Sequence, residues 1–241
     1  MFGKTIQDFV SFLKKPHPIQ ENKTINTKSL TQLFYLFLIT YLFKTTWLLT
    51  VNKYLRSIYD VKRSEIADTS EQSIWIFFLL AVFVYPVVEE FIFRYYLKSK
   101  KVLSLIVVCL FVFLTAYWMA KGFNYPSLLI KRMSLIVSSL LPVILIIWYY
   151  IKQKKDGRLD KMFSKFYFIP FYVSVVAFSL LHGFNFDFSN NNILVIPFLI
   201  PFLFSGMTYA YTRVKFGMWA NLSLHISFNL TTFILDKGLG I

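Results

Sequence analysis

Three short stretches of the sequence place ionisable or amide side chains within otherwise apolar segments. The first is Glu89–Arg94, where two carboxylates and a guanidinium close an apolar run. The second ends in His182, and the third runs from His225 to Asn229. Because ionisable groups are costly inside apolar segments that can cross a membrane, they usually mark a functional site.

The spacing of the first stretch assigns different roles to its two glutamates. Glu90 and Arg94 are four residues apart, so on a helix they share a face and can form an ion pair. Glu89 points about 100° away from that face, which leaves it with a free carboxylate. The alternative is a helix end that emerges into water, with Arg94 as an anchor at the membrane interface.

The third stretch belongs to a longer pattern. Asn221, His225 and Asn229 recur every four residues, so one helix presents them as a polar stripe. Structural interpretations remain open here, because asparagine can join helices and His182 taken alone can be a packing residue. Together with Glu89, however, the two histidines form a set that indicates chemistry.

This set suits the hydrolysis of an amide bond. Among Glu89, His182, His225 and Asn229, the carboxylate would act as general base for water, and one imidazole could steer that water. The second imidazole and the asparagine amide would donate hydrogen bonds to the oxyanion. We expect no cofactor. The alternative is a zinc ion held by Glu89, His182 and His225, although the sequence has no HExxH pair on one helix. Serine chemistry is disfavoured because there is no GxSxG motif.

The composition indicates which elements position these residues. Of 241 residues, 56% are hydrophobic and 16% are charged, whereas soluble domains contain roughly 45–50% and about 25%. This excludes an ordinary soluble enzyme and a disordered chain. The net charge of +14 fits basic loops against an anionic leaflet better than nucleic-acid binding. The single cysteine, Cys109, cannot form an internal disulfide.

The predicted fold class is all-α, a polytopic membrane helix bundle with about seven transmembrane helices, six to eight being possible. Each predicted span approaches the roughly 20 apolar residues that a bilayer requires. The first contains Lys44, and prolines interrupt the fifth and sixth. Gly206 is expected to allow close helix packing. The predicted spans are 30–51, 73–95, 102–120, 133–151, 166–184, 193–211 and 215–235.

An amphipathic interfacial helix is predicted before the first span, with an apolar face opposite its charged residues. That face comprises Phe2, Ile6, Phe9, Val10 and Leu13. The whole chain, residues 1–241, is predicted to be a single transmembrane domain, with a cytoplasmic or interfacial segment at 1–28 and the protease-like core at 73–235. Alternate loops on one side hold about twice as many lysines and arginines as those on the other. We therefore expect a multi-pass protein of the cell membrane with a cytoplasmic N-terminus and an external C-terminus.

The motifs resemble those of the CAAX-protease and bacteriocin-processing intramembrane endopeptidases, the CPBP or Abi family, which includes the prenyl-protein CAAX endopeptidases. The EExxxR motif is found at Glu89–Arg94, FxxxH at Phe178–His182 and HxxxN at His225–Asn229. The resemblance covers residues 75–100 and 170–235. It implies a glutamate-type protease whose catalytic residues are Glu89, His182, His225 and Asn229. In that scheme Glu89 activates water with help from His182, His225 and Asn229 line the oxyanion, and Glu90 and Arg94 support the site.

The expected activity is therefore hydrolysis of a peptide bond in a membrane-associated substrate, either a peptide or a lipid-modified protein. Bacteriocin or signal-peptide maturation, self-immunity and CAAX-type processing all lie within this range. The principal alternative is a non-catalytic membrane scaffold or immunity protein that uses the same polar residues as a structural network. A transporter would also carry such groups near its midplane, but the two halves of the sequence show no repeat. The sequence does not define an oligomeric state.

Overall fold

The computed structural model describes residues 1–19, 25–59, 61–63, 73–95, 97, 165–183, 185–187 and 195–238. This part of the chain is predominantly helical, apart from one antiparallel pair of two-residue strands. Its elements are α1 (Phe2–Lys14), α2 (Thr27–Trp47), the π-helix η1 (Leu48–Asn52), α3 (Lys53–Tyr59), β1 (Lys62–Arg63), α4 (Ile74–Leu79), the π-helix η3 (Leu80–Val84), α5 (Tyr85–Arg94), α10 (Phe168–Gly183), β2 (Phe186–Asp187), α11 (Val195–Phe216) and α12 (Met218–Gly238).

Two continuous helical stretches are long and apolar enough to cross a bilayer: the 33 residues of Thr27–Tyr59 and the 21 residues of Ile74–Arg94. They coincide with the predicted spans 30–51 and 73–95. The predicted spans 166–184, 193–211 and 215–235 correspond to α10, α11 and α12, which are helical but do not meet the same criterion; α10 is apolar but has only 16 residues. The predicted spans 102–120 and 133–151 lie outside the described residues.

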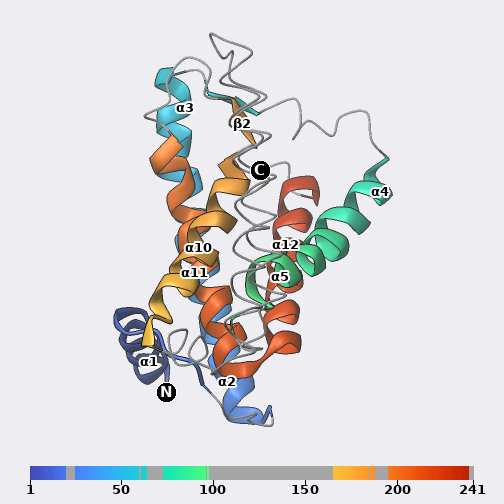
Figure 1. The fold of residues 1–241 in the computed structure, drawn as a ribbon. Coiled ribbons are helices and arrows are strands. Elements are labelled where there is room, and N and C mark those ends of the chain that lie inside the picture. Colours follow the sequence, from blue (N-terminus) through green and yellow to red (C-terminus); the bar gives the residue numbers. More distant parts are fainter. Residues whose placement is uncertain are drawn as a thin grey trace, which may run out of the picture.

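Large apolar side chains remain exposed on the outer faces of the helices. Trp75 of α4 is 73% exposed, and Phe34 and Leu42 of α2 are more than half exposed. Figure 1 shows α4 extending away from the centre of the helices, and its Phe77 and Phe78 make ring contacts with Phe233 of α12. Extended apolar surfaces of this kind are unusual on soluble monomers and mark contacts with a membrane or with another protein.

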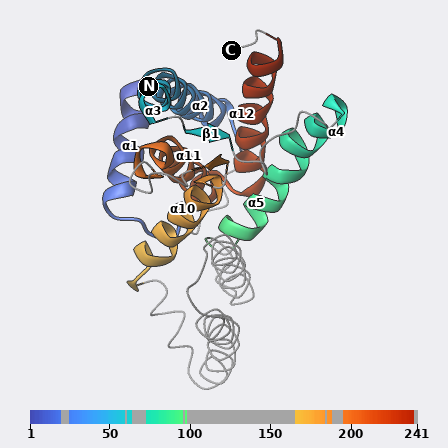
Figure 2. The ribbon, with the colours of Figure 1, turned by 90° about the horizontal axis from the view of Figure 1, so that it is seen from above.

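Helix α11 lies at the centre of the described bundle, packed against α10, α2 and α12. Helix α5 packs against both α10 and α12, as seen from above in Figure 2. Gly206 lies where α11 crosses α10, and a Cβ atom there would lie 3.2 Å from the Phe178 ring, which confirms the expected close packing. Gly217, with φ +97°, provides the sharp turn between α11 and α12.

A proline inside α11 creates a contact with α2. Pro201 has no N–H, so it cannot donate to the carbonyl of Pro197 one turn earlier. The indole Nε1 of Trp47 donates to that carbonyl instead, at 2.9 Å. The hydroxyls of Thr40 and Thr208 add a second polar contact between the two helices, at 2.9 Å. In lipid, apolar helix surfaces provide no hydrophobic driving force for one particular arrangement of helices. Polar contacts between helices therefore help to fix their relative position.

A second proline, Pro86, also leaves a backbone carbonyl without an N–H donor, and a side chain from another helix bonds to that carbonyl. The N–H of Tyr85 donates to the carbonyl of Leu80, five residues earlier. In this widened turn, the carbonyl of Ala81 would accept from residue 86, but Pro86 has no N–H. The side-chain amide of Asn229 in α12 donates to the Ala81 carbonyl at 2.8 Å. An asparagine on the last described helix therefore completes the hydrogen bonding of the helix that carries both glutamates.

The predicted amphipathic helix is present as α1, and the predicted apolar face is buried in part, because Ile6 and Leu13 are half-buried and Phe9 is buried. Phe9 and Phe12 are buried, and both pack against the ring of Tyr211 in α11. Phe2 and Val10, predicted on the apolar face, are 45% and 42% exposed. The reason is that α1 packs against α2 and α11 along one narrow side, which leaves the rest of its apolar face uncovered.

Candidate functional site

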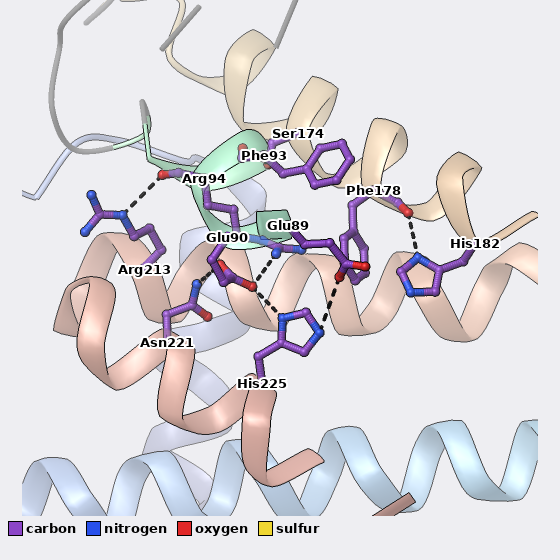
Figure 3. Close-up of polar contacts among 10 residues, drawn as sticks. All are labelled: Glu89, Glu90, Phe93, Arg94, Ser174, Phe178, His182, Arg213, Asn221 and His225. Atoms are coloured by element: carbon purple, nitrogen blue, oxygen red, sulfur yellow. Dashed lines mark hydrogen bonds and ion pairs between the residues drawn. The ribbon is translucent and has the colours of Figure 1, made fainter. Parts of the chain in front are cut away.

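Glu90 is the centre of a buried polar network between α5 and α12 (Figure 3). Arg94 Nη1 lies 2.5 Å from its Oε1, which confirms the predicted pair. Nδ1 of His225 lies 2.7 Å from the same oxygen, and the amide of Asn221 donates to the other carboxylate oxygen. Glu90 and Arg94 are both 0% exposed. A buried carboxylate requires such partners, because its desolvation is otherwise strongly unfavourable.

The guanidinium of Arg94 lies against two aromatic rings. It is 4.3 Å from the centroid of Phe178 in α10 and 5.1 Å from that of Tyr209 in α11. Cation–π contacts of this kind stabilise a desolvated charge. The ion pair at the end of α5 is therefore held by side chains from three other helices.

The end of α5 is also fixed through its backbone. Arg213 of α11 donates to the carbonyls of Arg94 and Tyr95, each at 3.2 Å. The hydroxyl of Ser174 in α10 donates to the carbonyl of Phe93 at 2.7 Å. These bonds satisfy carbonyls that have no partner at the end of a helix, so the site has a rigid support.

Glu89 faces away from the Glu90–Arg94 pair, as predicted. Its Oε2 lies 3.6 Å from Nε2 of His225, and its side chain is 15% exposed. This separation exceeds a direct hydrogen bond, and the same oxygen has no hydrogen-bond partner among the residues that the structure describes. The ring of His225 thus lies between two carboxylates, bonded to Glu90 and facing Glu89.

His182 is joined to the other motif residues by Phe178. Its Nδ1 lies 2.9 Å from the Phe178 carbonyl. Since a carbonyl only accepts, Nδ1 carries the proton and Nε2 of the neutral ring is an acceptor. The ring of Phe178 lies between the two imidazoles, with centroid distances of 4.5 Å to His182 and 5.9 Å to His225. The three motifs are therefore brought together around one phenylalanine.

Asn229 was predicted to be an oxyanion donor, and the structure gives one of its two amide N–H groups a different partner. That N–H donates to the Ala81 carbonyl on η3. The side-chain amide of asparagine has two donors, so one contact does not exhaust its capacity.

Three further residues belong to the site but were not predicted as site residues. Asn221 bonds to Glu90, Phe178 contacts Arg94 and both histidines, and Tyr209 stacks on His225 with centroids 4.3 Å apart. The stripe spacing marked Asn221, and the FxxxH motif contains Phe178. Tyr209 lies in the stretch from Gly206 to Asn229, which resembles the CPBP family's run into its last motif, but its contact with His225 depends on how α11 packs against α12.

The metal alternative concerns Glu89, His182 and His225. Within the described ranges, no three His, Cys, Asp or Glu side chains form a group that could hold a metal ion.

The described residues define a helical protein with two helices able to cross a membrane and a buried network of Glu, Arg, His and Asn among α5, α10, α11 and α12. No protein-family model, curated protein or solved structure matches the chain.

Proposed function

We propose that this protein is a glutamate-type intramembrane endopeptidase that hydrolyses a peptide bond of a membrane-associated peptide or lipid-modified protein. One observation carries the proposal. Two adjacent glutamates have separate environments: Glu90 is fully paired, whereas Glu89 Oε2 faces His225 and has no hydrogen bond within the described residues. A carboxylate that does not maintain the fold is free to act as a base.

In the proposed reaction, Glu89 accepts a proton from water as the water oxygen bonds to the carbonyl carbon of the substrate. The acceptor Nε2 of His182 orients the same water. The oxyanion receives hydrogen bonds from the remaining N–H of Asn229 and from His225 when its Nε2 carries a proton. Glu89 then returns the proton to the amide nitrogen as the C–N bond breaks, which regenerates the carboxylate.

Glu90 and Arg94 support this chemistry without taking part in it. Their ion pair and its bonds to Asn221 and His225 fix the imidazole that faces Glu89. The resemblance of the three motifs to those of the CPBP family favours the same division of roles. In this proposal the protein is a multi-pass protein of the cell membrane, its N-terminus is cytoplasmic, and neither a metal nor another cofactor is required.

The second candidate function is a non-catalytic membrane scaffold or immunity protein. It is favoured by the degree to which the polar groups bond to each other, with Glu90, Arg94, Asn221 and His225 forming one network and Asn229 bonded to the backbone. A network of this kind can serve only to join helices.

The deciding experiment uses the full-length chain, reconstituted in liposomes and incubated with a library of short peptides whose products are identified by mass spectrometry. We expect the wild type to cleave a subset of peptides, Glu89→Gln to abolish cleavage and His225→Ala to reduce it strongly. Asp8→Asn, a carboxylate change in α1, is the matched control and should cleave normally. Cleavage that survives Glu89→Gln, or a wild type no more active than Glu89→Gln, would refute the protease and favour the scaffold.

A further inference from the structure

The polar network does not include Lys44, although it is an ionisable group within a candidate membrane span. It lies in α2, whose sequence from Leu33 to Phe43 has no other charged residue. Its ammonium is 4.5 Å from the ring centroid of Phe228 and 5.0 Å from that of Phe202. A lysine is energetically costly in such a segment, so a lysine found there usually has a function.

The two rings beneath Lys44 belong to the candidate site. Phe202 stacks on the imidazole of His182, with centroids 4.5 Å apart. Phe228 lies within the HxxxN motif, three residues after His225, and is buried. The ammonium is also close enough to Glu89 to interact with it electrostatically. Lys44 therefore borders the site from α2, the helix that contributes none of the three motifs.

The contacts of Lys44 leave its hydrogen-bonding capacity unused. Cation–π contacts stabilise the charge, but an ammonium also has three N–H donors. Within the described part of the chain, Lys44 has neither a hydrogen bond nor a carboxylate within ion-pair distance. A flexible cation held over aromatic faces, with its donors available, is suited to bind an anion that enters the site.

We propose that Lys44 binds a carboxylate of the peptide substrate next to the scissile bond, and so selects acidic substrates. This inference rests on the proposed function, since it assigns the substrate class of the same site. The carboxylate could be the C-terminus of the peptide or an Asp or Glu side chain. The simpler role for Lys44 is to balance the charge of Glu89, and the experiment must separate the two.

The test is a binding assay that does not depend on cleavage. Full-length protein carrying Glu89→Gln is titrated with one fluorescent apolar peptide in three forms: free C-terminal acid, C-terminal amide, and amide with one internal aspartate. Adding Lys44→Met should weaken binding of the acidic forms about 10- to 100-fold, the range for a hydrogen bond to a charged group, and leave the plain amide unchanged. Whichever acidic form binds more tightly identifies the source of the carboxylate.

Two further variants complete the design. Lys53→Met removes an exposed lysine from α3, on the same continuous helical stretch, and should change nothing. Lys44→Arg keeps the charge and should retain the preference for acid. Equal weakening of acid and amide by Lys44→Met, or an acid preference that survives it, would overturn the inference. The proposed function fails independently, if cleavage survives Glu89→Gln.

Discussion

The hydrogen bond from Asn229 to the Ala81 carbonyl can be tested quantitatively, because a substitution at Pro86 restores the missing backbone N–H. The carbonyl lacks a backbone partner since Pro86 has no N–H. Asn229→Ala should leave that carbonyl unsatisfied. The same substitution in a Pro86→Ala background should matter much less, because the new N–H of residue 86 can donate to the carbonyl itself.

The magnitude follows from the geometry of the bond. At 2.8 Å it is a good hydrogen bond between partly buried groups. Leaving such a group unpaired costs about 1–3 kcal/mol, and side-chain hydrogen bonds between membrane helices are worth about 0.6 kcal/mol on average and up to about 1.7 kcal/mol. We therefore expect Asn229→Ala to lower the free energy of unfolding by about 1–2 kcal/mol alone, and by less than half of that with Pro86→Ala.

The assay is a double-mutant cycle, with unfolding followed in mixed detergent micelles by helicity. Asn221→Ala is the matched control, because this asparagine is on the same helix but donates to Glu90. Its effect should be the same in both backgrounds. If Asn229→Ala costs the same with and without Pro86, the missing N–H of Pro86 is not the reason that the Ala81 carbonyl bonds to Asn229. Peptide cleavage is measured in the same variants. If Asn229→Ala abolishes cleavage and adding Pro86→Ala does not restore it, Asn229 has a chemical role beyond positioning.

Three other results are expected. Trp47→Phe should lower the free energy of unfolding by about 1 kcal/mol, and less in a Pro201→Ala background, again measured by a double-mutant cycle; equal costs would contradict the bond to the freed carbonyl. Gly206→Ala should displace the ring of Phe178 and slow peptide cleavage, whereas Gly3→Ala, which has open space around it, should not; normal turnover in Gly206→Ala would show that the ring adapts freely. Cleavage should persist after treatment with a metal chelator, and loss that added zinc restores would favour the zinc alternative.

Local sequence patterns predicted the features that depend on one helix. The four-residue spacing of Glu90 and Arg94 predicted their ion pair, and the direction of Glu89 followed from the helical repeat. Two predicted spans coincide with helices able to cross a bilayer. The seven-span count itself remains a prediction, because the spans at 102–120 and 133–151 lie outside the described residues.

Features that depend on contacts between helices were not predictable in the same way. The position of His225 between two carboxylates requires α5 and α12 to pack at one particular register. The partner of Asn229 depends on the π-helix before Pro86, which leaves the Ala81 carbonyl without a backbone donor. The donor that replaces it, Asn229, is 148 residues away in the sequence. Amphipathicity located α1 and part of its buried face, including Phe9, but not the exposure of Phe2 and Val10, since neighbouring helices decide which part of an apolar face is covered.

The two prolines that release backbone carbonyls differ in the order of their partners along the chain. Trp47 precedes the Pro197 carbonyl, whereas Asn229 follows the Ala81 carbonyl. The carbonyl of Ala81 is part of a helix that can enter the bilayer early, yet its donor is 148 residues further along the chain. A bare carbonyl is unfavourable in hydrocarbon, so this helix stays incomplete until α12 arrives. A chain that ends before Asn229 would lack the donor for the Ala81 carbonyl, so in a bilayer its Ile74–Arg94 helix would be less stable than that of the full-length chain.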